Sequence, residues 1–148
     1  MSLRYIREVV VGSHDVAAAT RFHQAAFDLA VLETTEDGEA LLGVPEAPGG
    51  RLRLTPVGPA DPGWEPPKVW DLGGRLLGMY SHDLHRTVDA MAAAGGAPRQ
   101  PVTYPYGTAS LSELVGRGTD GVWWTVPLAV PGAHRPSAAF AAHPDRLH

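Results

Sequence analysis

The sequence predicts an α+β fold made of two tandem βαβββ modules. The chain has 148 residues, enough for one ordinary domain or two small modules. The motif Ser-His-Asp occurs at residues 13–15 and again at 81–83, each time between a strand-like run and a helical pattern. A motif repeated within the same order of elements is typical of an internal duplication.

The first module is expected to begin with a strand over residues 5–12, where β-branched residues follow one another. Asp15 then caps a helix over 16–30, because its carboxylate can accept the free N–H groups of the first turn. Apolar residues at helical spacing give this helix one buried stripe. Three more strands follow, at 31–35, 40–44 and 51–57, and Glu36-Asp37-Gly38 forms the turn between the first two.

The second module repeats this order. We expect a strand over 76–80, a helix over 84–94 capped by Asp83 and ended by Gly95-Gly96, and strands within 100–106, 109–116 and 122–129. Residues 59–74 contain too many prolines and glycines for a regular element. The predicted organisation is therefore a first module over 1–58, a linker over 59–74, a second module over 75–129 and a tail over 130–148.

Composition excludes several classes of protein. A formal charge of −4 is unfavourable for a protein that follows nucleic-acid phosphates, and no apolar run is long enough to cross a membrane. The absence of cysteine excludes disulfides, thiolate catalysis and Cys-ligated metals. Phosphate-binding glycine motifs and the GxSxG nucleophile motif are missing. Without a signal-peptide pattern, we expect a cytoplasmic protein.

Three passages resemble the vicinal oxygen chelate superfamily, which includes glyoxalases, bleomycin-resistance proteins and extradiol dioxygenases. They are the helix after Asp15 with its end at Phe27-Asp28-Leu29, the strand and helix over 76–96, and the turn and strand over 118–124. The resemblance covers residues 5–129. It implies that both modules form one cupped mixed β-sheet with the helices outside, and that the protein is a homodimer.

Active members of that superfamily hold a divalent metal with four strand side chains, and the resemblance assigns these positions to Glu8, Arg53, Leu76 and Thr125. Leucine has no donor atom and arginine repels a cation. A shift of one residue in any strand does not restore a ligand set. We therefore expect no metal and no other cofactor.

Strand alternation places Glu8 on the face opposite the valines at 9 and 11, inside the cup if the helix covers the valines. Arg53 is its expected partner, either in a plain salt bridge or as the group that tunes a polar anchor or general base. The same alternation directs Gly78, Tyr80 and Trp123 toward the cup. These aromatic side chains either fill the core or contact an aromatic ligand.

The sequence thus predicts a metal-free binding protein for an aromatic or polycyclic metabolite, with ligand contacts from Glu8, Arg53, Gly78, Tyr80, Trp123 and Thr125. The alternative is an enzyme on the same cup, a lyase, isomerase or cyclase with Glu8 as acid or base. A metal-dependent enzyme stays open if the strand alignment is wrong. His14 and His82 are interpreted as residues of the strand–helix corners. The expected partners are a small molecule and a second copy of the chain, with no nucleic acid and no membrane.

Overall fold

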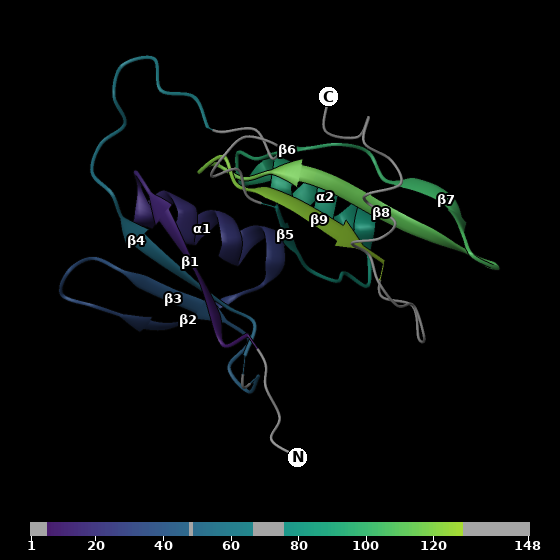
Figure 1. Ribbon diagram of the computed structural model, residues 1–148, viewed down its shortest axis with the longest axis horizontal. Coiled ribbons are helices and arrows are strands. Elements are labelled where there is room, and N and C mark those ends of the chain that lie inside the picture. Colours follow the sequence, from purple (N-terminus) through teal and green to yellow (C-terminus); the bar gives the residue numbers. More distant parts are fainter. Residues whose placement is uncertain (1–5, 48, 67–75, 129–148) are drawn as a thin grey trace. The chain divides into compact units, whose positions relative to one another are not determined.

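The computed structural model describes residues 6–47, 49–66 and 76–128 (Figure 1). The chain divides into two compact units, Met1–Trp64 and Glu65–His148. The boundary between the units falls within the stretch expected to be a linker, and residues 59–66 form no helix or strand. The rest of that stretch, 67–74, and the tail over 130–148 lie outside the described residues. No helix in the described ranges is long and apolar enough to span a membrane.

The first unit is a βαβββ module with one helix against a four-stranded mixed sheet (Figure 1). Strand β1 pairs in parallel with β4, and β3 pairs antiparallel with both β4 and β2. The strand order is β1-β4-β3-β2. The elements are β1 (Glu8–Ser13), α1 (Val16–Phe27), β2 (Ala30–Thr34), β3 (Ala40–Gly43) and β4 (Arg51–Pro56).

The second unit has the same topology, with the order β5-β9-β8-β6 and β7 also paired with β8. Strands β5 and β9 are parallel, as β1 and β4 are in the first unit. The elements are β5 (Leu76–Gly78), α2 (Leu84–Ala93), β6 (Ala97–Pro98), β7 (Val102–Tyr106), β8 (Ala109–Arg117) and β9 (Trp123–Pro127). The α+β fold class and its two βαβββ modules are therefore confirmed.

The strand expected within 100–106 is β7, and an additional short strand, β6, precedes it and pairs with the same neighbour, β8. The pairing Pro98↔Gly116 becomes Val102↔Glu113, so the register shifts by one residue between them. Pro101 lies in this gap and has no N–H for the ladder. Strand β2 of the first unit shows a register shift at the corresponding place, between Val31 and Glu33. The duplication thus extends to the irregular point of each sheet.

The two Ser-His-Asp copies have the same structural role at the start of a helix. The Asp15 carboxylate accepts a hydrogen bond from the Ala18 N–H at 2.8 Å, and the Asp83 carboxylate accepts one from the Arg86 N–H at 3.0 Å. In each copy the serine Oγ accepts the N–H of the aspartate. Both aspartates are therefore the predicted N-caps, and each repeat starts a helix directly after a strand.

Helix α1 ends at Phe27, three residues before the expected end at residue 30. Asp28 adopts the left-handed conformation with φ of 54° and its N–H bonds to the Gln24 carbonyl, which closes the last turn. The buried stripe is the predicted one, with Ala19, Phe22, His23 and Ala26 enclosed.

Removal of one cap should destabilise the chain without touching any other contact. We expect Asp83→Ala to lower the free energy of unfolding by about 1 kcal/mol, because α2 loses the acceptor for the Arg86 N–H. Urea denaturation followed by circular dichroism measures the difference. The control is Asp89→Ala, which removes the same charge from an exposed position within α2. Equal losses in both variants would contradict the capping role.

Candidate functional site

The first unit has one sheet face against α1 and one face away from it, which we call the open face. On β4, Leu52 and Leu54 are buried while Arg51, Arg53 and Thr55 alternate with them. Helix α1 packs against β3 and β4 on the leucine side. The three polar residues of β4 therefore lie on the open face, together with Glu8 of β1.

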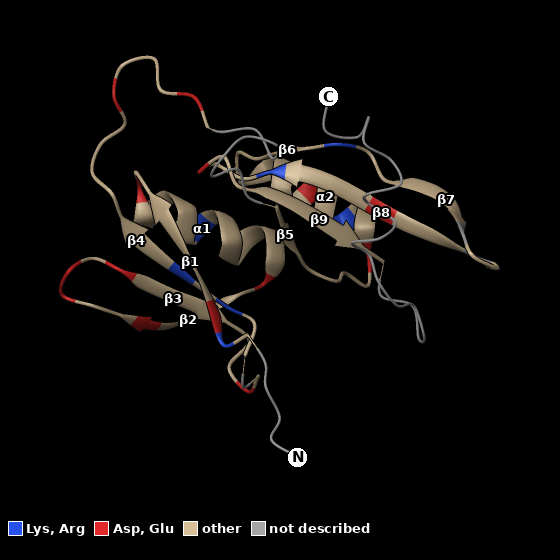
Figure 2. Cartoon of the chain, viewed as in Figure 1, with Lys and Arg blue, Asp and Glu red and all other residues tan. Residues whose placement is uncertain are grey.

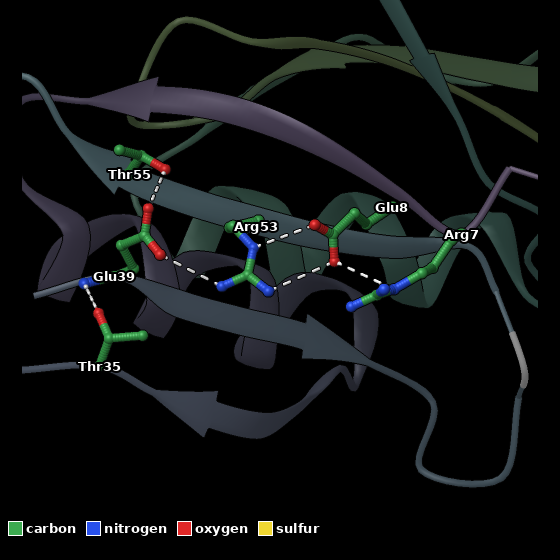
Figure 3. A network of polar contacts seen from close by, with 6 residues as sticks. All are labelled: Arg7, Glu8, Thr35, Glu39, Arg53 and Thr55. Atoms are coloured by element: carbon green, nitrogen blue, oxygen red, sulfur yellow. Dashed lines mark hydrogen bonds and ion pairs between the residues drawn. The ribbon is translucent and has the colours of Figure 1, made fainter.

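Glu8 and Arg53 are partners, as predicted. The Arg53 Nε donates to Glu8 Oε1 at 3.2 Å and its Nη2 donates to Oε2 at 3.4 Å (Figure 3). The third contact was not predicted: Arg53 Nη1 donates to Glu39 Oε2 at 3.2 Å. The Thr55 hydroxyl donates to the other Glu39 oxygen at 2.9 Å. We call Glu8, Glu39, Arg53 and Thr55 the Arg53 network.

The network is enclosed enough for its charges to matter. The side chain of Arg53 is 15% exposed and that of Glu8 is 22% exposed. The hydrogen bond from Arg53 lowers the pKa of Glu8, outweighing the opposite effect of burial, and the charges of Arg53, Arg7 and Arg51 lower it further. The same hydrogen bond raises the pKa of Arg53. Glu8 is thus held as a carboxylate and is a weaker base than a free glutamate.

The four positions that the resemblance assigned to a metal do not fit a divalent cation. Both oxygens of Glu8 accept hydrogen bonds from the guanidinium of Arg53, which is itself cationic. Leu76 has no donor atom, and the hydroxyl of Thr125 donates to Glu113. Over the described ranges, no group of three or more His, Asp or Glu side chains could hold a metal ion. These donors suit hydrogen bonding rather than metal coordination.

The predicted residues of the second unit lie on or beside its parallel strand pair. Gly78 of β5 pairs with Thr125 of β9, and Trp123 stands two residues before Thr125 on the same face. The Trp123 ring is partly buried and lies under the Arg99 guanidinium, with Cζ 5.6 Å from the ring centroid. Tyr80 follows β5 and is 51% exposed. Trp124 is buried, as expected of a core residue.

A carboxylate that sequence reasoning missed lies beside Thr125. Glu113 of β8 is 0% exposed and accepts hydrogen bonds from the hydroxyls of Thr125 and Tyr104. We call these three residues the Glu113 cluster. One signal could have found it: along β8, Glu113 shares its face with Leu111 and Val115, so an acidic residue interrupts an apolar alternation.

Glu113 and Glu39 hold equivalent places in the two units. Arg53 of β4 pairs with the residue two positions after Glu39, and Glu39 accepts a hydrogen bond from Arg53. In the same way, Thr125 of β9 pairs with the residue two positions after Glu113, and Glu113 accepts a hydrogen bond from Thr125. The duplicated fold therefore carries one carboxylate at the same position of each sheet, with a guanidinium as donor in one and hydroxyls in the other.

The histidines of the described ranges give no sign of a shared site. The His14 Nδ1 lies 2.7 Å from the Gly58 carbonyl oxygen, and its ring packs edge-on against Trp64. His82 is exposed at the matching corner. His23 is fully buried in α1 with Nδ1 2.7 Å from the Ala19 carbonyl oxygen. None of the hydrogen bonds described above for the Arg53 network and the Glu113 cluster involves a histidine.

No protein-family model and no curated protein sequence matches this chain. Solved structures match its fold. A glyoxalase/bleomycin resistance protein from Albidiferax ferrireducens T118 is 18% identical with a TM-score of 0.60, covering 84% of this chain and 98% of that one. TioX from Micromonospora sp. ML1 is 20% identical with a TM-score of 0.60, covering 86% and 100%.

A glyoxalase-related enzyme from Fulvimarina pelagi is 18% identical with a TM-score of 0.62, covering 86% of this chain and 89% of that one. At such identities the comparison establishes the fold. The predicted resemblance to glyoxalases and bleomycin-resistance proteins is therefore confirmed as a likeness of fold.

The ion pair should make stability depend on pH through Glu8. Arg53 lowers the pKa of Glu8 in the folded state. The Glu8 carboxylate therefore stabilises the fold fully above its unfolded-state pKa of about 4.3. This stabilisation is lost as the pH falls through the lower folded-state pKa. We expect wild type to unfold at higher urea concentration than Glu8→Gln at neutral pH, with the gap closing in acid. Glu46→Gln, at an exposed position, is the control. A gap that stays constant across this range would refute the pairing.

The two units allow a comparison of what it costs to remove a hydroxyl donor from an enclosed and from a more exposed glutamate. We expect Thr125→Val to cost about 1–3 kcal/mol, because it removes a donor from the enclosed Glu113 carboxyl without changing side-chain volume. Thr55→Val removes a donor from Glu39, whose side chain is 27% exposed, so water can replace it and the loss should be smaller. Denaturant unfolding of both variants measures the difference. A larger loss in Thr55→Val would contradict this reading.

Proposed function

We propose that this chain binds a small aromatic or polycyclic metabolite without a metal ion. The observation that carries the proposal is the Arg53 network, in which a guanidinium occupies both oxygens of Glu8, the one carboxylate among the four positions that the resemblance assigned to a metal. A salt-bridged, half-buried polar group beside apolar surface gives a small molecule fixed hydrogen-bonding partners and a place for its rings.

Apolar surface flanks this network in the first unit. Along β1, Val10 stands next to Glu8 on the same face and is 57% exposed. Val10 also pairs directly with Arg53 of β4. A large apolar side chain left open beside a satisfied ion pair supports contact with an apolar ligand.

The aromatic side chains of the second unit support the same proposal. Tyr80 is half exposed, and Trp123 presents a ring that already holds one cation, Arg99. Tyrosine and tryptophan combine a large flat surface with one polar atom, which suits ring stacking with a metabolite. Gly78 adds no side chain on the strand next to Thr125 and leaves room on that face.

Chemical catalysis is the second candidate, since the fold also occurs in a glyoxalase-related enzyme. In that case Glu8 would be the acid or base of a lyase, isomerase or cyclase reaction. The lowered pKa of Glu8 and the occupation of both its oxygens favour a role as anchor over a role as base. The fold itself is compatible with either function.

Ligand titration tests the proposal. We expect the tryptophan fluorescence of the full chain to change saturably with at least one member of an aromatic metabolite panel. Arg53→Gln should weaken that binding about tenfold or more, because Glu8 and Glu39 lose their shared donor. Arg86→Gln, at an exposed position of α2, is the control. If no compound binds, or if both variants bind as wild type does, the proposal fails.

Metal analysis and turnover separate the candidates further. We expect binding to persist after chelation and dialysis, because the donor set of Glu8, Arg53, Leu76 and Thr125 suits no divalent ion. About one Fe, Mn, Ni or Zn per chain that is lost on chelation together with function would overturn the metal-free proposal. Turnover of a bound compound that Glu8→Gln abolishes, with binding retained, would instead establish the enzyme.

A further inference from the structure

Arg51 is a basic residue of the open face that the Arg53 network leaves without a carboxylate. It is the first residue of β4 and lies on the same face as Arg53, two residues later. Its stem crosses β3 at a glycine: a Cβ placed on Gly43 would lie 3.2 Å from Arg51 Cγ. The missing side chain at Gly43 thus leaves room for the stem of Arg51, and Leu32 of β2 borders the same point.

The other arginines near this face have partners. Arg53 binds Glu8 and Glu39, and the Nε of Arg7 lies 3.7 Å from Glu8. No such contact exists for Arg51 among the residues that the structure describes. Its Nε is enclosed by the protein and donates to no described group. Figure 2 shows acidic and basic positions mixed over this unit.

The carboxylate opposite Arg51 in the sheet does not serve as its partner. Glu8 is opposite Arg51 in the parallel register, and the charge of Arg51 helps to lower its pKa. Both Glu8 oxygens, however, accept hydrogen bonds from Arg53. The Nε is enclosed, but the two terminal nitrogens of Arg51 are not among the buried atoms and have no described partner. Their N–H groups form a fork that matches a planar carboxylate.

We propose that Arg51 binds the carboxylate of the ligand, so that the metabolite is an aromatic acid. This inference rests on the proposed function and adds the charged group of its ligand. The acid would accept hydrogen bonds from the terminal N–H groups of Arg51, while Glu8 and Glu39 continue to pair with Arg53 beside it. The competing explanation is that Arg51 serves only to cover Gly43 and Leu32 with its alkyl stem.

Matched acids and amides distinguish the two explanations. The probes are benzoate, naphthoate and anthracene carboxylate, each compared with its own amide, titrated into the full chain by calorimetry. We expect at least one acid to bind wild type about tenfold or more tightly than its amide. Arg51→Met keeps the stem and removes the charge, and should abolish this preference, whereas Arg51→Lys should retain part of it.

Arg21→Gln, an exposed position of α1, controls for the loss of one positive charge from the chain. It should leave the preference unchanged. If acids and amides bind wild type equally, or if Arg51→Met keeps the preference, Arg51 does not bind the acid and the proposed function still stands. If neither acids nor amides bind any form while other metabolites do, the ligand is not an aromatic acid. If nothing binds at all, the proposed function fails as well.

Discussion

The double pairing of Arg53 is the interaction on which the open face of the first unit depends. Arg53 of β4 donates to Glu8 on β1 and to Glu39, the residue just before β3. A half-buried cation requires acceptors on more than one side, and these two carboxylates supply them. The pairing keeps Glu8 ionised, occupies both of its oxygens and leaves Arg51 without a carboxylate. The character of the face as a hydrogen-bonding surface follows from this one contact.

The two units show what a duplicated fold retains and what it changes. Both keep the serine and aspartate of the helix cap, the strand order and a glutamate at the same place in the sheet. The donor to that glutamate differs: Arg53 in the first unit, and Thr125 with Tyr104 in the second. A guanidinium adds charge and remains partly hydrated, whereas hydroxyls allow the carboxyl to be fully enclosed. The duplication thus produces one charged face and one buried polar cluster.

The side chains rather than the fold decide the function, because one fold can host both binding proteins and enzymes. A base for proton transfer should have a free oxygen and a pKa near the working pH, and Glu8 has neither property. A polar group that anchors a ligand should be held in place by other side chains, and its charge should be balanced by a partner. The Arg53 network meets both conditions. The exposed Val10 beside this network is the apolar surface that the proposed function assigns to a ligand.

The sequence by itself determined the duplicated modules, both helix caps and the Glu8–Arg53 pair, because these follow from short-range spacing and strand alternation. The partners of Glu39 and Glu113 and the unpaired state of Arg51 required the tertiary structure. Their contacts depend on which residues face each other across β3, β4, β8 and β9, and each sheet has a register shift on the strand beside them. Alternation assigns a residue to a face of a sheet, but only the register of the folded strands decides which neighbour it meets.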